Sequence, residues 1–364
     1  MTVGRCNLLC PFAHSPIRPF AHSPIRPLLS IKNKNFALKI INKVISFSSA
    51  NQLYNFEKNS LNKTEWEHLI LSIDKPNLMQ IWDYGEALNQ IGWTTERYLV
   101  YYDNNLIAFF QVFKKKYFYS TLVKLQRGPL FLDESYLNIH LAPVLNKIRG
   151  YWRFWKGQHL QIEFELPQSY TYYDLLLELG FRRAKSLFWE STQIDLTLGE
   201  EQLFKNLKGD WRNSLRKSIK NKLELKKTIN RNDFDWLIDQ YEGFKKNKNI
   251  VGVSKDLLYA LYYQMTKDQK MHIMLAQYAN EPIAGVIIVT HGNGCSYLLG
   301  WNGELGRKLK AHNFLLWNAV KEAKNRGELF FDLGGVLSNK KYKSISDFKS
   351  GLNGEKYALI GEFY

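Results

Sequence analysis

The sequence predicts a mixed α/β (α+β) fold made of two modules, and three observations support this. The chain has 364 residues, more than one hydrophobic core usually supports. Strand and helix patterns follow one another in the same order in both halves. One strand-turn-strand element occurs twice, as Tyr102-Asp-Asn-Asn-Leu-Ile-Ala108 and Tyr278-Ala-Asn-Glu-Pro-Ile-Ala284. We therefore expect an internal duplication.

The first 50 residues are expected to be a disordered basic leader. Residues 11–26 repeat the octapeptide PFAHSPIR, which is too short and too rich in proline to form a solenoid. We assign no function to this segment.

The first module is expected to span residues 51–197. The polar turn Asp103-Asn-Asn105 separates two strand-like runs and indicates a hairpin. The hydrophobic pattern predicts helices at 63–72, 82–91 and 141–155, and strands at 98–102, 106–113 and 160–166.

The second module is expected to span residues 198–364, because Asp195-Leu-Thr-Leu-Gly199 leads into a helical pattern. The predicted elements are helices at 201–219 and 313–325, and strands at 223–228, 273–278, 283–290, 295–300 and 329–333.

Composition limits the class of protein. The 22 Phe, 21 Tyr and 10 Trp residues can fill two cores, and three cysteines without a CxxC pair favour a reducing compartment. No run of about 20 apolar residues predicts a membrane span, and residues 1–30 lack a signal-peptide core. We expect a cytoplasmic protein that can also contact the inner face of the membrane.

The formal charge of +16 favours a polyanionic partner such as nucleic acid, a nucleotide-linked substrate or an anionic membrane. Compositional drift towards lysine explains the same excess without a partner. Lys205, Lys208, Arg212 and Arg216 recur at helical spacing, so they are expected to share one face that attracts phosphates. A solvated helix face is the alternative.

Several reaction classes lack their motifs in this sequence. It contains no GxSxG, HExxH, P-loop or GxGxxG motif, and its His residues show no metal-ligand spacing. We therefore expect no metal site and no His-dependent triad. His312, before an apolar helix, is interpreted as a cap or a core contact.

Two segments near the C-terminus carry the candidate chemistry. Asp332-Leu-Gly-Gly335 places an acid and two glycines at a strand end, where the backbone can approach a ligand closely. Ser346-Asp-Phe-Lys-Ser-Gly351 places Lys349 beside an aromatic residue. A fixed lysine can stabilise the oxyanion of acyl transfer to an amine. Either Asp332 or the substrate and solvent then accept the proton of the amine.

The order of short motifs over about residues 60–364 resembles the Fem family of peptidoglycan bridge-forming aminoacyltransferases. The matching segments are Gln80-Ile-Trp82, Gln126-Arg-Gly-Pro129, Leu179-Gly-Phe-Arg182, Asp195-Leu196, Trp211-Arg-Asn-Ser-Leu-Arg-Lys217, Tyr297 to Gly300, Asn313-Phe-Leu-Leu-Trp317, Asp332-Leu-Gly-Gly335, Phe348-Lys-Ser-Gly351 and Ile360-Gly-Glu-Phe363.

This resemblance implies two tandem GNAT-like domains, each a mostly antiparallel mixed sheet flanked by helices. It implies transfer of an amino acid from aminoacyl-tRNA, as co-substrate without a further cofactor, to an amine of a nucleotide- or lipid-linked cell-wall precursor. Lys349 would contact the reacting carbonyl, and Arg212 and Arg127 would lie near the acceptor or structure its cleft. The other substrate-binding positions implied are Arg216, Tyr297, Asn313, Gly334, Gly335 and Phe348.

The sequence also departs from the family pattern. The segment Trp82-Asp-Tyr-Gly-Glu-Ala87 lacks the lysine that relatives using a nucleotide-linked muramyl peptide carry. Residues 301–310 lack the glycine pattern with which ordinary GNAT enzymes hold CoA, so CoA is the less expected donor. Two alternatives stay open: an N-acyltransferase using acyl-CoA or acyl-carrier protein on a lipid, sugar or polysaccharide, and a non-catalytic module that binds RNA or precursor.

Overall fold

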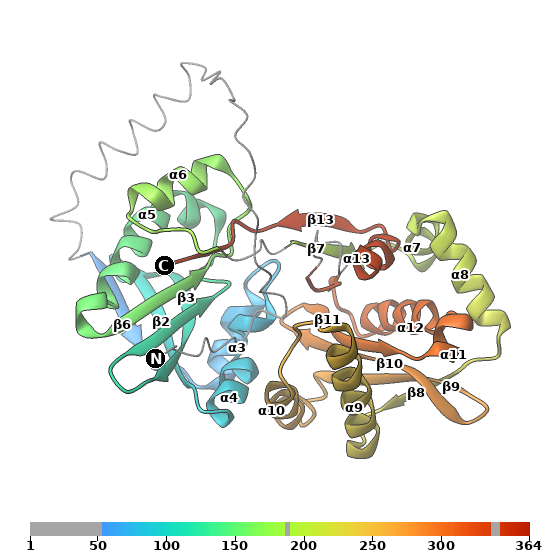
Figure 1. The fold of residues 1–364 in the computed structure, drawn as a ribbon. Helices are drawn as coiled ribbons and strands as arrows, with labels where there is room; N and C mark the ends of the chain where they lie inside the picture. The colour runs from blue at the N-terminus through green and yellow to red at the C-terminus, as the bar shows by residue number, and fades with distance from the viewer. Residues whose placement is uncertain (1–52, 186–189, 336–342) are drawn as a thin grey trace, which may run out of the picture.

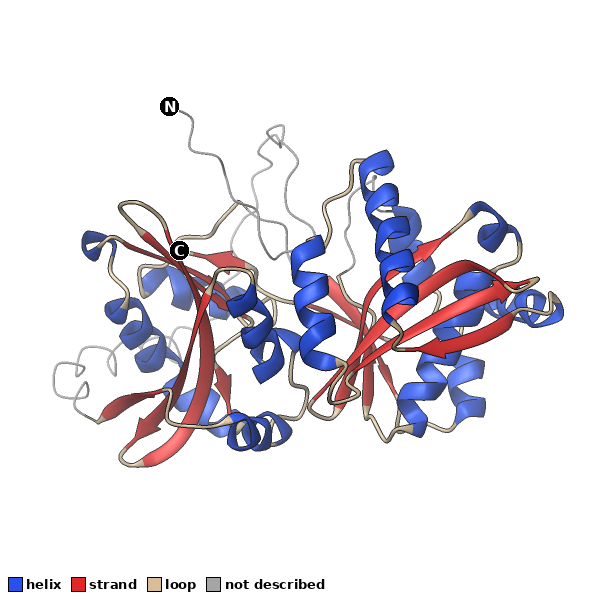
Figure 2. Cartoon of the chain, turned by 90° about the horizontal axis from the view of Figure 1, so that it is seen from below, coloured by secondary structure: helices blue, strands red, loops and turns tan. Residues whose placement is uncertain are grey.

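The computed structural model describes residues 53–185, 190–335 and 343–364. The described chain forms two β-sheets that lie side by side, each covered by helices on its faces (Figure 1, Figure 2). The two-module α/β architecture predicted from the sequence is therefore confirmed.

The first sheet has the strand order β1-β2-β3-β4-β6-β14, and β5 pairs with β3. All its pairs are antiparallel except β4 with β6. Its strands are β1 (Tyr54–Lys58), β2 (Thr94–Tyr102), β3 (Asn105–Lys116), β4 (Thr121–Gln126), β5 (Leu130–Phe131), β6 (Gln158–Glu163) and β14 (Glu362–Phe363).

Helices cover both faces of the first sheet. Side chains from α5 and α6 pack with the sheet in one core, and side chains from α3 and α4 pack on the other face. These elements are α3 (Lys63–Leu71), the 3-10 turn η1 (Leu78–Gln80), α4 (Trp82–Gln90), α5 (Glu134–Tyr151), the 3-10 turn η2 (Phe154–Lys156) and α6 (Tyr170–Glu178).

The second sheet has the strand order β13-β7-β12-β11-β10-β9-β8, and only β11 and β12 are parallel. Its strands are β7 (Glu190–Asp195), β8 (Glu224–Thr228), β9 (Met271–Tyr278), β10 (Glu281–His291), β11 (Gly294–Asn302), β12 (Phe330–Asp332) and β13 (Glu355–Ala358). The helices around it are α7 (Glu200–Asn206), α8 (Gly209–Lys220), α9 (Arg231–Lys248), α10 (Lys255–Met265), α11 (Glu304–Lys308), α12 (Ala311–Asn325) and α13 (Lys343–Ser350).

The duplicated hairpin predicted from the sequence is present in both sheets. It joins β2 to β3 in the first sheet and β9 to β10 in the second. Both turns place two consecutive residues at positive φ, as two-residue hairpin turns require. These residues are Asp103 (47°) and Asn104 (61°), and Ala279 (51°) and Asn280 (66°).

The helix predicted over residues 201–219 is two helices. Leu207 and Lys208 have extended ψ angles of 142° and 147°, and these break the helix between α7 and α8. The expected common face of Lys205, Lys208, Arg212 and Arg216 is therefore wrong as stated, because Lys205 precedes the break and Lys208 lies within it.

The two sheets exchange strands, so a boundary between residues 197 and 198 does not separate them. Strand β7 precedes this boundary but pairs with β12 and β13 in the second sheet. Strand β14 returns to the first sheet, where Phe363 is fully buried and lies 5.7 Å, between ring centroids, from Phe164. Hydrophobic patterns do not identify such long-range pairings.

A buried ion cluster joins the two domains. Asp83 on α4 is fully buried and accepts hydrogen bonds from Lys63 Nζ (2.6 Å) and Lys270 Nζ (2.9 Å). Lys270, which precedes β9 in the second domain, also pairs with Glu67 on α3. One hydrophobic core contains residues from α4 and from α10, so apolar packing joins the same faces.

In the described part of the chain, no helix is both long and apolar enough to span a membrane.

Candidate functional site

The candidate site lies where β11 and β12 separate. They pair in parallel only over Gly294–Ser296 and Phe330–Asp332, and β11 then continues to Asn302 beyond the end of β12. Helix α13 approaches this opening, as do Gly334 and Gly335, which follow β12. A sheet that opens in this way leaves backbone polar groups available to a ligand.

Two cavities meet at the opening. One, of about 150 Å³, lies between the domains, and the other, of about 1050 Å³, lies among α9, β11, α12 and α13. Lys349, Tyr297 and Gly300 line both cavities. A ligand in either cavity can therefore reach the same lysine.

Lys349 is a buried cation held by the backbone. Its Nζ donates hydrogen bonds to the carbonyl oxygens of Gly334 (3.1 Å) and Gly335 (3.0 Å), and it lies 5.2 Å from the ring centroid of Tyr297. Burial lowers the pKa of Lys349 to about 8, although the carboxylate of Asp332 opposes the shift. An ammonium has three donors, so among the described residues one N–H is left for a ligand.

The carboxylate of Asp332 holds the segment around Lys349 in place through hydrogen bonds. It accepts hydrogen bonds from Ser191 Oγ (2.7 Å), Gly334 N (2.7 Å), Tyr357 Oη (2.6 Å) and Gln193 Nε2 (3.3 Å). These four donors occupy the roughly four lone-pair positions of a carboxylate. Asp332 is therefore better suited to fixing the loop than to accepting a substrate proton.

Gly334 must be glycine for this loop to form. Its φ is +66°, and a Cβ at this position would lie 2.9 Å from the carbonyl oxygen of Tyr297. Gly334→Ala is therefore expected to lower the free energy of unfolding by about 1–2 kcal/mol or more, measured by chemical denaturation. Gly209→Ala is the matched control, because no atom lies within 4 Å of its added Cβ. Equal stability of the two variants would contradict this explanation.

His312 also belongs to the site, although its sequence context predicts only a cap or a core contact. Its ring stacks on Phe348 at 5.5 Å between centroids, and its buried Nε2 has no hydrogen-bond partner among the residues that the structure describes. A Cβ on Gly300 would lie 2.7 Å from this nitrogen and 2.3 Å from Tyr297 Oη, so both polar atoms border the same narrow space. Burial and the charge of Lys349 lower the pKa of His312 to about 4. The imidazole is therefore neutral near pH 7.

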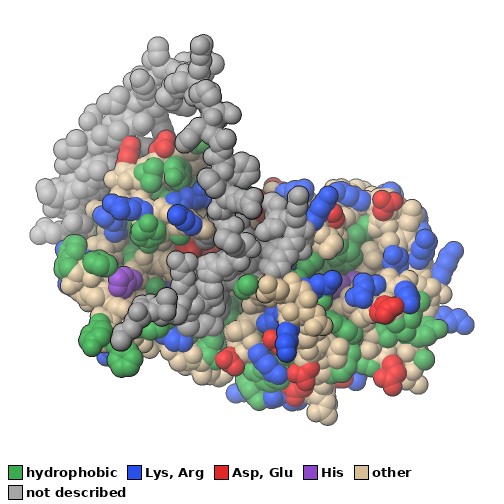
Figure 3. Space-filling view, in the orientation of Figure 1, with side chains coloured by type: hydrophobic (Ala, Val, Ile, Leu, Met, Phe, Trp, Pro, Cys, Tyr) green, Lys and Arg blue, Asp and Glu red, His purple; other side chains and the backbone are tan. Residues whose placement is uncertain are grey.

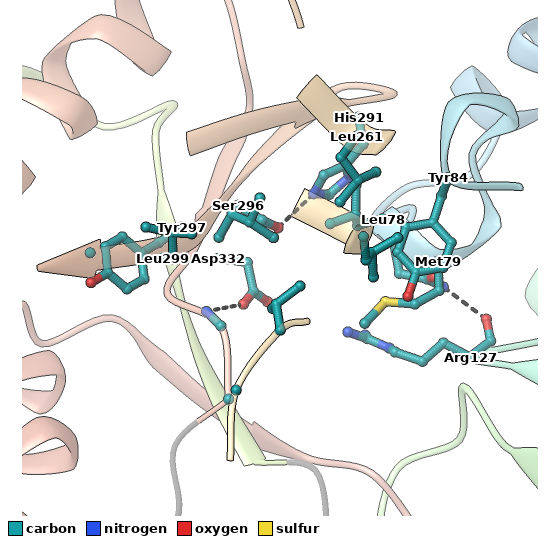
Figure 4. A pocket seen from close by; sticks show the side chains of 18 of the residues that line it. Leu78, Met79, Tyr84, Arg127, Leu261, His291, Ser296, Tyr297, Leu299 and Asp332 are labelled. Atoms are coloured by element: carbon teal, nitrogen blue, oxygen red, sulfur yellow. Dashed lines mark hydrogen bonds between the residues drawn. The ribbon is translucent and has the colours of Figure 1, made fainter. Parts of the chain in front are cut away.

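The first domain contributes Arg127 to the cavity between the domains. Arg127 is buried and donates from Nε and Nη2 to the carboxylate of Glu165, both at 2.6 Å. Figure 4 shows Arg127 and Met79 facing Asp332, Ser296 and His291 across this cavity. The charge of Glu165 raises the pKa of Arg127, so the guanidinium remains a fixed cation.

His291 and Ser296 form a further polar pair in this cavity. His291 Nε2 and Ser296 Oγ are hydrogen-bonded at 2.6 Å, and burial lowers the pKa of His291 to about 4 (Figure 4). In the β10–β11 ladder His291 is opposite Gly294 and Ser296 is opposite Val289, so the two side chains meet diagonally across the strands close to the turn. The predicted strands on either side of this turn could have indicated their proximity.

Most of the residues selected from the sequence come together here, and two do not. Lys349, Asp332, Gly334, Gly335, Tyr297, Asn313, Phe348 and Arg127 line one or both cavities. Arg212 and Arg216 lie on α8 and line neither cavity. Their neighbour Trp211 instead packs on Phe348, with ring centroids 6.0 Å apart.

In residues 53–185, 190–335 and 343–364, no three His, Cys, Asp or Glu side chains gather as metal ligands would.

Comparison with known proteins places this arrangement among GNAT folds. The family model of the acetyltransferase (GNAT) domain matches residues 209–344. The crystal structure of FemX superimposes with a TM-score of 0.70 at 14% identity, covering 84% of this chain and 96% of FemX.

Two further structures show lower similarity. A conserved protein from Bacteroides thetaiotaomicron VPI-5482 has a TM-score of 0.49 and 11% identity, covering 84% of this chain and 99% of that protein. A tandem GNAT protein from the clavulanic acid biosynthesis pathway has a TM-score of 0.48 and 9% identity, covering 85% of this chain and 97% of that protein. No curated protein sequence matches the chain. The family match and FemX support a GNAT-fold acyltransferase, and the chain is a protein with a Fem-like fold of two GNAT-like domains.

Proposed function

We propose that the protein is an aminoacyltransferase that moves an amino acid from aminoacyl-tRNA to an amine on the stem peptide of a peptidoglycan precursor. The observation that carries the proposal is the position of Lys349, a backbone-held cation at the junction of two cavities. Two cavities meeting at one cation suit a donor and an acceptor that react beside it. The motif order that resembles the Fem family supports this choice of substrates, and the fold is similar to that of FemX.

The proposed reaction needs no protein nucleophile. The amine attacks the ester carbonyl, a C–N bond forms, and negative charge develops on the carbonyl oxygen. The remaining N–H of Lys349 stabilises this oxyanion. The C–O bond to the ribose then breaks, the nitrogen releases a proton, and the leaving oxygen gains one. A lysine with a pKa of about 8 can relay this proton because it loses and regains it near neutral pH.

In this proposal His312 positions the acceptor amine. Its buried Nε2, which no described side chain or backbone group contacts by a hydrogen bond, can accept one from the acceptor amine and orient the amine towards the carbonyl. With a pKa of about 4 it is too weak a base to remove the proton alone. His312 is therefore assigned as a positioning residue, and Asp332, with its four hydrogen-bond donors, as a structural acid.

The donor tRNA is proposed to contact α8. Arg216 and Lys217 are exposed on this helix, which also carries Trp211, the residue that packs on the cavity-lining Phe348. In the space-filling view, Lys and Arg side chains are prominent along this end of the second domain (Figure 3). Phosphates of a tRNA whose acyl end enters the site can pair with them.

Salt dependence tests this contact. The double variant Arg216→Gln/Lys217→Gln is expected to bind tRNA more weakly and to reduce the slope of log affinity against log salt by about two, since each lost phosphate contact removes about one. Binding is measured by fluorescence anisotropy across a salt series. The control, Lys246→Gln/Lys267→Gln, removes the same charge from exposed positions elsewhere in the second domain. An equal change in both variants would show a general charge effect and contradict an α8 site.

Transfer from acyl-CoA is the second candidate, and the acetyltransferase family match is the observation that favours it. The purified protein is incubated with radiolabelled aminoacyl-tRNA, acyl-CoA or acyl-carrier protein, each with muropeptide, sugar and lipid amines. Label moving from tRNA to a muropeptide amine supports the first function. Label moving only from acyl-CoA or acyl-carrier protein replaces it with the second, and no transfer from any donor would indicate a binding module.

A further inference from the structure

Four exposed aromatic side chains lie together at one end of the first sheet. Phe118 and Tyr119, in the β3–β4 turn, are 101% and 97% exposed. Phe154 and Trp155, in η2, are 74% and 73% exposed. Single exposed apolar residues are common, but four large rings in two adjoining turns are not. We call these four residues the aromatic tip.

Backbone contacts hold the two turns of the aromatic tip against each other. Thr121 N donates a hydrogen bond to the carbonyl oxygen of Gly157 (2.7 Å), which directly follows η2. A Cβ on Gly157 would lie 3.1 Å from the carbonyl oxygen of Tyr119, so the two turns are in close contact. Hydrogen bonds within each turn, from Tyr117 N to Ser120 O (2.7 Å) and from Gly157 N to Phe154 O (2.8 Å), fix their shapes. The rings therefore project from a rigid base.

The surroundings of the aromatic tip are basic. Residues 114–124 and 149–159 contain seven Lys and Arg residues and no Asp or Glu. Lys116, Arg153 and Lys156 are exposed, and the guanidinium of Arg153 lies 5.0 Å from the ring centroid of Trp155. Exposed rings surrounded by cations complement a surface with an apolar interior and negative head groups.

We propose that the aromatic tip inserts into the interface of an anionic lipid membrane and docks the protein there. Phe, Trp and Tyr are favoured at the boundary between head groups and acyl chains, and neighbouring Lys and Arg gain from anionic lipid. RNA is less well matched, because single-stranded nucleic acid stacks on rings along a groove, whereas these rings project from the ends of two turns. The site is new and does not depend on the proposed transfer reaction.

The aromatic tip is distant from the candidate site, so the two can be tested separately. Strand β4 begins at Thr121, beside the tip, and ends at Gln126, next to Arg127. The five steps between these two residues, at about 3.3 Å each, place the ends roughly 17 Å apart. Docking by the tip would therefore hold the cavity between the domains near the membrane without blocking it.

Vesicle binding of the full chain tests the docking surface. Co-sedimentation is measured with vesicles of phosphatidylcholine alone and with vesicles also containing phosphatidylglycerol. The chain is expected to bind the anionic vesicles more tightly. Phe118→Ser/Trp155→Ser is expected to weaken this binding at least about 100-fold, since each buried ring contributes about ten-fold or more. Lys116→Gln/Lys156→Gln is expected to weaken it by about five-fold per residue, and only on anionic vesicles.

The control variant is Tyr170→Ser, which removes a 90% exposed ring at the start of α6, outside the aromatic tip. It should bind vesicles as the wild type does. Thermal unfolding should be unchanged in every variant, because exposed side chains contribute little to stability. Absence of vesicle binding by the wild type, or equal binding by Phe118→Ser/Trp155→Ser, would refute the proposal. Loss of single-stranded RNA binding in that variant, with vesicle binding intact, would identify RNA as the partner instead.

Discussion

Lys349→Met is expected to reduce transfer by about 100- to 1000-fold or more, the effect of removing one preorganised oxyanion donor. Methionine keeps the length of the side chain but removes the charge and all three N–H groups. The carbonyl oxygens of Gly334 and Gly335 lose their donor, so stability is also expected to fall by about 1–3 kcal/mol. Single-turnover transfer and chemical denaturation measure the two effects separately.

Two further measurements distinguish chemistry from misfolding in this variant. Lys343→Met removes an exposed lysine from the same helix and should keep full activity. In the wild type, transfer should decline as pH rises through about 8, where Lys349 loses its proton. An active, folded Lys349→Met protein would remove this residue from the mechanism.

The sign of the stability change with pH follows from the same lowered pKa. Between pH 8 and 10.5, the unfolded chain binds a proton at Lys349 that the folded chain has released. The contribution of Lys349 to the free energy of unfolding therefore rises with pH in that window. The rise should be present in the wild type and absent in Lys349→Met.

Asp83→Ala is expected to cause the largest loss of stability among the variants considered, about 3–5 kcal/mol. The substitution removes the fully buried carboxylate that accepts hydrogen bonds from Lys63 and Lys270 and leaves both ammonium groups without it. Since Lys270 belongs to the second domain, contact between the domains is weakened as well. Thermal and urea denaturation measure the loss.

Asp174→Ala is the matched control for Asp83→Ala, because Asp174 is exposed on α6 and its removal should change stability by less than about 0.5 kcal/mol. Lys270→Met should cost less than Asp83→Ala, since Asp83 keeps its bond to Lys63. If Asp83→Ala unfolds at the same urea concentration as its control, the ion cluster does not stabilise the protein.

The local elements of the fold could be predicted from the sequence, and the sheet partners could not. The hairpin at Asp103-Asn104 was predicted because turn residues and strand periodicity act over a few positions. The break at Leu207 was missed because charged residues continue the helical pattern across it. Strands β7, β13 and β14 are short and pair with distant segments, so their partners depend on packing that no local pattern encodes.

For the candidate site, the sequence likewise identified several residues but not the contacts between them. Lys349, Gly334 and Asp332 were found because glycines and charges cluster in two short segments. Their roles within the site were not evident, since Asp332 meets donors from β7 and β13 that are distant in sequence. The place of His312 in the site could not be predicted, because its surroundings arise only when α12 packs against α13. Arg212 and Arg216 are grouped with the site by their charge and by the family resemblance, yet neither lines either cavity.

The return of β14 to the first sheet has a consequence for synthesis. Ile360 and Phe363 belong to the core of the first domain, so that core lacks part of its packing until residues 360–363 have been translated. Domains usually become complete in order from the N-terminus to the C-terminus. Here the order is reversed, because all strands of the second sheet precede β14, the last strand of the first sheet. A released chain that ends at residue 359 should therefore have a first domain that proteases cleave more readily than the second.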